Sequence, residues 1–334
     1  MQLLSYSDID LQAWKNLIDK SPTATWFQTP EAYAFYSSVQ EEMEPFCFAI
    51  SHENTLQGVI IGYITKVSSR IVQFFSRRAI IIGGPLLDEH ISDEVLSTLL
   101  LNVKKSLREV IYIETRNFND YSRWKLVFEK CGFIYQPHLN FHVDTSSQEM
   151  VGHNFSESRK RDIRTTIREG VTPVYKPTIE QVRAYYEILN DLYKTKVRTP
   201  LFDWEFFEKL YRVEHAHYIL TEYLGHIIGG TIVMELPNKA MYEWYECGLD
   251  GVGEHIYPST YATYLGLTYA AEHDCPLFDM MGAGQPNVPY GVRDFKAKFG
   301  GELVEHGRYL YVRNPMLYWI GKMGVKWLKN RTNK

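Results

Sequence analysis

One order of strands and helices occurs twice along this chain, and this repetition limits the fold more than any other feature of the sequence. In the first half, apolar and alternating runs predict a hairpin, a third strand, a helix and a buried strand, at residues 45–51, 56–67, 79–87, 95–107 and 110–115. The second half has the same series at residues 216–223, 226–236, 240–249, 258–273 and 277–281. We interpret the series as an internal duplication.

The spacing between corresponding positions is nearly constant. These positions are 165–170 residues apart in the pairs Ile50 and Leu220, Ile113 and Phe278, and Gly132 and Gly300. Gly62 corresponds to Gly229 or Gly230 in the second hairpin. Chance is the alternative, since strands and helices alternate in many proteins. The duplication predicts a mixed α/β fold with two tandem domains, residues 1–148 and 149–334, each a partly antiparallel sheet flanked by helices.

Composition excludes several classes of protein. The net charge of -4 argues against a protein that coats nucleic acids, although a local basic patch remains compatible with it. Four scattered cysteines without CxxC spacing indicate reduced thiols and no zinc site, and we expect no metal. The first residues lack a signal-peptide pattern, and no stretch of about 18 apolar residues would span a membrane. We therefore expect a cytoplasmic protein.

Several short segments together carry a resemblance to a known family. They are Leu126–Phe133, Asn140–Asp144, Arg159–Arg164, Gly170–Val171, Phe278–Gly282, Tyr290–Val292 and Phe295–Glu302. In these segments the chain resembles the Fem family, the aminoacyltransferases that build peptidoglycan cross-bridges, within the wider GNAT superfamily. The resemblance implies tandem GNAT domains and transfer of an amino acid from aminoacyl-tRNA to an amine of a muropeptide precursor. Since no sustained heptad run is present, we expect a form without the coiled-coil arm of some members.

The resemblance places Lys296, in the Phe295–Lys296 pair, at the reaction centre. Attack of an amine on an ester forms a tetrahedral oxyanion, which needs a fixed hydrogen-bond donor. The alternative for Lys296 is a surface lysine on a helix. Asp279 ends a buried strand, where α/β folds place functional groups, and we expect it to accept a proton or bind the amine. The alternative for Asp279 is a cap of the turn that follows.

The substrate-binding residues expected from the sequence come from two places. Strand alternation places Tyr245 with Glu243 on one face and Tyr242 with Trp244 on the other, so one of the two tyrosines would line the cleft. The resemblance further implies that Arg198 and the aromatic residue four positions later line a muramyl-nucleotide pocket. That residue is Phe202, where the family example has tyrosine. The alternative for Arg198 is an interdomain salt bridge.

Two basic helices are candidates for contact with larger partners. Arg161, Arg164 and Arg168 share one helix face and would meet a tRNA backbone or a precursor phosphate, unless the face is merely solvated. The segment 314–334 is amphipathic, with an apolar stripe of Met316, Trp319, Ile320, Met323 and Trp327 and a basic stripe of Lys322, Lys326 and Lys329. It would lie on the inner membrane surface or pack against the second domain.

The residues at the start of the helix at 258 indicate which acyl donor the protein uses. Coenzyme-A-dependent GNAT enzymes bind pyrophosphate there on a glycine-rich turn, but residues 254–260 have no glycine spacing and Pro258 lacks an N–H. Gly282–Gly284, which precedes Gln285 and Pro286, is a poor substitute for that glycine-rich turn. We therefore expect no tightly bound cofactor and favour aminoacyl-tRNA as co-substrate. The alternatives are an acyl-CoA-dependent enzyme that modifies a small or polysaccharide amine, and a catalytically inactive binding module.

Overall fold

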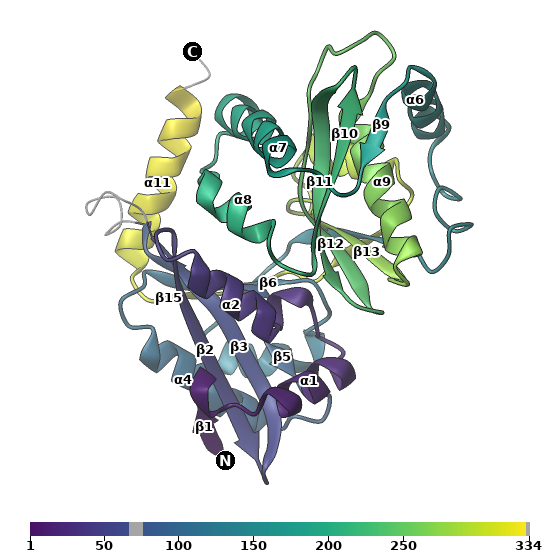
Figure 1. Cartoon of the computed structure of the whole chain (residues 1–334). Helices are drawn as coiled ribbons and strands as arrows, with labels where there is room; N and C mark the ends of the chain where they lie inside the picture. The colour runs from purple at the N-terminus through teal and green to yellow at the C-terminus, as the bar shows by residue number, and fades with distance from the viewer. Residues whose placement is uncertain (67–75, 332–334) are drawn as a thin grey trace. The chain divides into compact units, whose positions relative to one another are not determined.

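The computed structural model describes residues 1–66 and 76–331, with side chains up to residue 323. The chain forms two compact units (Figure 1). Unit 1 comprises Met1–Pro137 and His306–Lys334, and unit 2 comprises His138–Glu305. This division differs from the predicted boundary at residue 148 in two segments. Residues 138–148, predicted in the first domain, belong to unit 2, and the residues from 306 onward, predicted in the second domain, belong to unit 1.

Unit 1 is a mixed α/β unit. Its strands are β1 (Gln2–Leu4), β2 (Met43–His52), β3 (Thr55–Thr65), β4 (Arg78–Gly83), β5 (Leu86–Leu87), β6 (Tyr112–Asn117), β7 (Ile134–Gln136) and β15 (Arg308–Val312). Its helices are α1 (Leu11–Lys20), α2 (Pro30–Ser38), α4 (Asp93–Ser106), α5 (Lys125–Lys130) and α11 (Pro315–Arg331). Short 3-10 turns occur at Tyr6–Asp8, Trp26–Gln28 and Ser122–Trp124.

Unit 2 is also a mixed α/β unit. Its strands are β8 (Leu139–Asp144), β9 (Thr172–Val174), β10 (Ala216–Tyr223), β11 (His226–Leu236), β12 (Ala240–Gly248), β13 (Leu277–Gly282) and β14 (Glu302–Glu305). Its helices are α6 (Glu157–Arg168), α7 (Ile179–Leu192), α8 (Trp204–Leu210), α9 (Pro258–Glu272) and α10 (Gly291–Ala297). A π-helical turn, Tyr193–Val197, follows α7.

Apart from β5, which pairs with β3 outside the main path, the two sheets match strand by strand, which confirms the predicted fold class and its duplicated architecture. The path β1-β2-β3-β4-β6-β15-β7 of unit 1 corresponds to β9-β10-β11-β12-β13-β8-β14 of unit 2. In each path one pair is parallel, β4 with β6 and β12 with β13, and the other pairs are antiparallel. Gly132 and Gly300 also correspond, since both have positive φ (83° and 72°) just before the last strand of the path.

The sixth strand of each sheet comes from the opposite half of the sequence. β8 follows unit 1 in the chain but pairs with β13 and β14 in unit 2. β15 follows unit 2 but pairs with β6 and β7 in unit 1. The sequence does not predict this exchange, because a strand pattern is local and its pairing partner is not.

Local sequence explains the hairpins and the helix starts. Glu53 and Asn54 (φ 49° and 60°) form the turn of the β2–β3 hairpin, and Leu224 and Gly225 (φ 51° and 78°) form that of β10–β11. The N-cap of α1 is Asp10, whose side chain accepts a hydrogen bond from the Ala13 N–H.

A bulge recurs at the same place in both hairpins. The extra residue is Gln57 in β3 and Ile228 in β11, next to the pairs Ile50–Gly58 and Thr221–Gly229. Gly58, and not the predicted Gly62, is therefore the counterpart of Gly229.

Helices cover both faces of each sheet (Figure 1). In unit 1, α4 and α5 pack on the core formed by residues such as Ile60, Ile81 and Ile113. In unit 2, α9 packs on the core that contains Phe278 and Met280, while α7 and α8 cover the other face. Among the helices of the described residues, none combines the length and apolar character needed to cross a membrane.

The strand exchange makes a prediction about unit 1. Tyr309 on β15 is 1% exposed and stacks on Phe128 at 4.0 Å between ring centroids. We expect Tyr309→Ala to destabilise unit 1 by about 3–5 kcal/mol, the usual cost of truncating a buried aromatic side chain. Hydrogen-exchange mass spectrometry would show faster exchange in β6 and β7. Faster hydrogen exchange in β10–β12, with β6 unchanged, would contradict the placement of β15 in the sheet of unit 1.

Candidate active site

A β-bulge in β12 determines which side chains share a face of the unit 2 sheet. Val233 pairs with Glu243 and Ile232 with Tyr245, so Trp244 is the extra residue. The predicted alternation is therefore wrong, because it places Glu243 and Tyr245 on one face. After the bulge, Glu243 shares its face with Glu246.

The two glutamates face α9. Glu243 interacts with Thr263 of that helix, and Glu246 interacts with Ser259 in its first turn. Glu243 is 6% exposed, whereas Glu246 is partly buried. Burial raises the pKa of Glu243, and burial together with the charge of Glu243 raises the pKa of Glu246 to about 8.

Lys296 lies within the same group of charges. It belongs to α10 and is 9% exposed, which excludes the surface lysine considered from the sequence. Its Nζ donates hydrogen bonds to the Met280 carbonyl and, at 3.0 Å, to the Gly282 carbonyl. Burial lowers the pKa of Lys296, and the charges of Glu243, Asp279 and Glu246 act in the opposite direction.

Asp279 is fully buried in the middle of β13, and not at its end as predicted, and it has several partners. Its carboxylate accepts hydrogen bonds from Asn140 Nδ2 at 3.1 and 3.2 Å and from the Met281 N–H at 2.6 Å. His142 Nε2 lies 3.4 Å from Oδ2. Met281 has a positive φ of 57°, a conformation that costs a non-glycine residue about 1–2 kcal/mol. These bonds fix the turn whose carbonyls hold Lys296, and a direct catalytic role for Asp279 stays a prediction.

Arg159 is a site residue that the sequence does not single out. In the sequence, Arg159 belongs to a run of charged residues, which is typical of an exposed helix face, yet its side chain is only 5% exposed. Its guanidinium lies 4.5 Å from the ring centroid of Phe295 and 4.6 Å from that of Phe299, and it donates to Thr260 Oγ1 and the Phe295 carbonyl. Phe295 therefore contacts Arg159.

The other predicted arginines lie on the surface. Arg161 and Arg164 are exposed on α6, where Arg161 pairs with Asp162 at 3.3 Å. Arg198 is exposed after the π-helical turn with a φ of 56°, and its Nε donates to the Thr195 carbonyl at 3.2 Å.

The predicted aromatic residues lie in an internal cluster. Phe202 stacks on Phe206 at 4.3 Å, and Phe206 and Phe207 contact Tyr245 at 6.3 and 5.1 Å between ring centroids. Tyr245 is 8% exposed and Tyr242 2% exposed, so both are largely covered. The structure brings Phe202 and Tyr245 together through α8, on the face opposite the glutamates.

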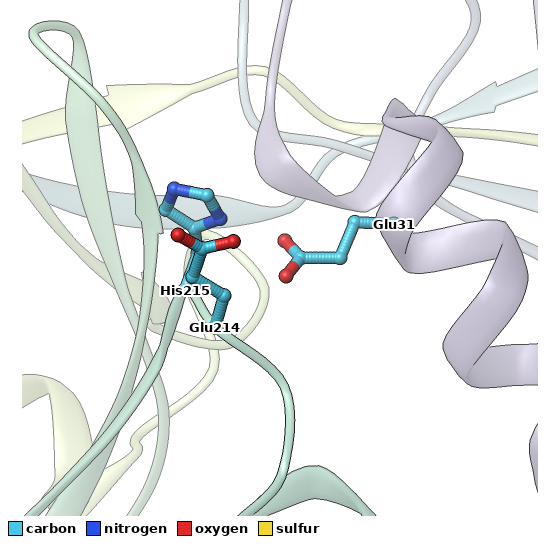
Figure 2. A group of neighbouring side chains, drawn as sticks. All are labelled: Glu31, Glu214 and His215. Atoms are coloured by element: carbon cyan, nitrogen blue, oxygen red, sulfur yellow. The ribbon is translucent and has the colours of Figure 1, made fainter.

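Acidic and histidine side chains also occur away from this group. Glu31 lies on α2 of unit 1, where it accepts a hydrogen bond from Trp26 Nε1 at 2.7 Å. Glu214 and His215 precede β10 in unit 2 (Figure 2). Because these residues belong to different units, we assign no metal site to them.

Comparisons with known proteins establish the fold. No family model and no curated protein matches the sequence. The chain is similar to the crystal structure of FemX, with a TM-score of 0.74 and 14% identity over 96% of this chain and 99% of FemX. It is also similar to L-PGS from Bacillus licheniformis (TM-score 0.59, 13% identity, 94% and 96% covered). A tandem GNAT protein from the clavulanic acid biosynthesis pathway matches with a TM-score of 0.56 and 10% identity, over 94% and 99%. The chain has a Fem-like tandem GNAT fold.

The raised pKa of Glu246 predicts a pH-dependent effect on stability. Since its folded-state pKa of about 8 exceeds the ordinary 4.5, its contribution to stability is present below pH 4.5 and is lost as pH rises through 8. Glu246→Gln removes this titration. Between pH 5 and 8.5 we expect the variant to gain about 1–3 kcal/mol relative to wild type, measured by urea denaturation. A difference independent of pH would contradict the assignment.

Proposed function

We propose that this protein is an N-acyltransferase that transfers an aminoacyl group from aminoacyl-tRNA to an amine of a peptidoglycan or other cell-envelope precursor. The observation that carries the proposal is the buried ammonium of Lys296, held at the end of β13 by two backbone carbonyls. The similarity of the fold to FemX and L-PGS supports an acyltransferase.

The chemistry needs what this lysine offers. The acceptor amine attacks the ester carbonyl, a C–N bond forms, and the carbonyl oxygen takes negative charge in the tetrahedral intermediate. That intermediate then breaks the bond to the tRNA oxygen, and the proton lost by the attacking nitrogen passes to this oxygen, which leaves as the 3′-terminal hydroxyl of the tRNA. A lysine ammonium has three N–H groups, and two of those of Lys296 are used by Met280 and Gly282. The third is available to stabilise the oxyanion in a site with little water.

The start of α9 supports aminoacyl-tRNA over acyl-CoA as donor. A Cβ on Gly248 would lie 2.5 Å from the Ser259 nitrogen and 2.7 Å from Pro258, so the end of β12 packs closely over the first helical N–H groups. Pro258, the first residue of the helix, lacks an N–H. Glu246 adds a carboxylate beside Ser259. A pyrophosphate would meet covered donors here and a carboxyl group that it would have to keep protonated.

The surface residues complete the proposal. Arg198 would contact a phosphate of the precursor, and Phe202 would shape the neighbouring surface of α8, with the buried Tyr245 packed against Phe206. Arg161, Arg164 and Arg168 on the exposed face of α6 would contact the tRNA backbone. An acyl-CoA-dependent enzyme and an inactive module are the rival functions.

The C-terminal helix would bring the enzyme to a lipid-linked acceptor. α11 contacts unit 1 through Tyr318, whose ring lies 5.2 Å from that of Tyr112, and its packing against the second domain stays a prediction. Its apolar residues Met316, Trp319, Ile320 and Met323 are 38–68% exposed. Trp327, Lys326 and Lys329 lie outside the described side chains. We propose that this face binds an anionic membrane surface.

Lys296→Met tests the catalytic assignment. Loss of the oxyanion donor should lower the transfer rate from aminoacyl-tRNA by about 10²–10³. Lys298→Met, at an exposed position two residues later, is the control and should keep wild-type activity. Unchanged transfer by the Lys296 variant, or ribonuclease-resistant transfer with acetyl-CoA alone, would overturn the proposal.

Vesicle co-sedimentation tests the membrane contact. We expect binding to vesicles that contain phosphatidylglycerol and little binding to pure phosphatidylcholine. Trp319→Glu should reduce the bound fraction about tenfold or more, because it places a charge in the apolar stripe. Leu126→Glu, at a 67% exposed position on α5, should have no effect. Equal binding by the Trp319 variant would contradict the role of α11.

A further inference from the structure

Three polar oxygens around Glu243 have no hydrogen-bond partner at bonding distance among the described residues, although Thr263 lies near Glu243 and Ser259 near Glu246. They are Oε1 of Glu243, Oε1 of Glu246 and Oγ1 of Thr263. Glu243 is 6% exposed and Thr263 is fully buried. A buried oxygen without a partner costs about 1–3 kcal/mol, so three of them in one place indicate a missing hydrogen-bond donor.

The charges around these oxygens do not balance. Glu243 and Glu246 both interact with Lys296, which is the one cation of the described residues that hydrogen-bonds at the end of β13. Arg159 also interacts with Glu246, and Asp279 interacts with both Glu243 and Lys296. When Glu243, Glu246 and Asp279 are all ionised, three negative charges face the two positive charges of Lys296 and Arg159. One negative charge in the group is then unmatched.

The group is less deeply buried toward the end of β12. Glu246 lies near the end of β12 and is partly exposed, as are Trp244 and Gly248 on the same strand, whereas Glu243 lies deeper. A ligand would thus reach Glu246 first and then Glu243 and Thr263. The bulge at Trp244 makes this arrangement possible, because it gives both glutamates the same face.

Resting on the proposed function, we infer that Glu243, Glu246 and Thr263 bind the α-ammonium group of an aminoacyl donor. A primary ammonium has three N–H donors and a single positive charge, which match three free acceptors and one surplus negative charge. The α-nitrogen and the ester carbonyl are attached to the same carbon atom. An ammonium held by the glutamates would therefore place that carbonyl close to Lys296.

The inference separates two classes of donor. An acetyl group has no ammonium, so it would leave the three oxygens unpaired, and sites built for a polar group reject analogues that lack it. N-acetylation of an aminoacyl donor removes the charge and two of the N–H groups. The site should therefore select donors with a free α-amine.

Binding of amino acid methyl esters tests the site without requiring transfer. Thermal shift would screen the esters of the twenty common L-amino acids, and calorimetry would give Kd values for the strongest. We expect at least one free-amine ester to bind, and its N-acetyl form to bind at least about tenfold more weakly. Equal binding of the two forms, or no binding by any ester, would overturn the inference.

Isosteric variants test which residues bind the ammonium group of the ester. Glu243→Gln and Glu246→Gln should each weaken binding of the free-amine ester by about 10- to 100-fold. Glu222→Gln on β10, whose carboxylate accepts a hydrogen bond from Gln181, is the control. Unchanged Kd values in folded glutamine variants would overturn the inference, and should neither variant fold, the comparison of ester with N-acetyl ester in the wild-type protein still decides it.

The site and the proposed function can fail separately. Transfer from aminoacyl-tRNA that requires Lys296 but proceeds equally from N-acetylaminoacyl-tRNA would overturn the ammonium site and keep the function. Binding of free-amine esters that requires Glu246, without transfer to any acceptor, would keep the site and overturn the function.

Discussion

The ammonium of Lys296 is buried in unit 2, and the surrounding structure is arranged to keep it there. Removing a lysine ammonium from water costs several kcal/mol unless hydrogen bonds and opposite charges compensate. Two carbonyls at the end of β13 and the carboxylates of Glu243 and Glu246 supply this compensation. The turn at Met281 orients the carbonyls, and Asp279 fixes that turn. The bulge at Trp244 turns both glutamates toward the lysine side of the sheet.

The exchange of strands connects this site with the duplicated architecture. Each sheet has the same strand order, and its sixth strand comes from the other half of the sequence. In unit 2 that strand is β8, which supplies Asn140 and His142 to Asp279. The residues that hold the turn therefore precede unit 2's other strands in the chain. Neither half of the sequence would complete its sheet alone.

Local patterns in the sequence predict much of this structure. The hairpin at 216–223 and 226–236 follows from its alternating residues and the turn at Leu224–Gly225, and the repeated order predicts two similar sheets. The features that the sequence does not predict depend on partners far away in the chain. Arg308–Val312 has a strand-like pattern, but nothing in it names β6 as its neighbour. Arg159 is buried by Phe295 and Phe299, more than 130 residues away. The bulge at Trp244 is defined by the pairing of β12 with β11, which the sequence of β12 alone does not reveal.

Titration of the Lys296 ammonium by NMR would test the account most directly. Lysine labelled at Cε would be observed in the free protein and with a phosphonate analogue of an aminoacyl ester, and Lys296→Met would assign the signal. The account predicts a pKa below the ordinary value of about 10.4 in the free protein, and a higher pKa once the negatively charged phosphonate lies beside it. A lysine that titrates as an exposed amine and ignores a bound analogue would contradict the account.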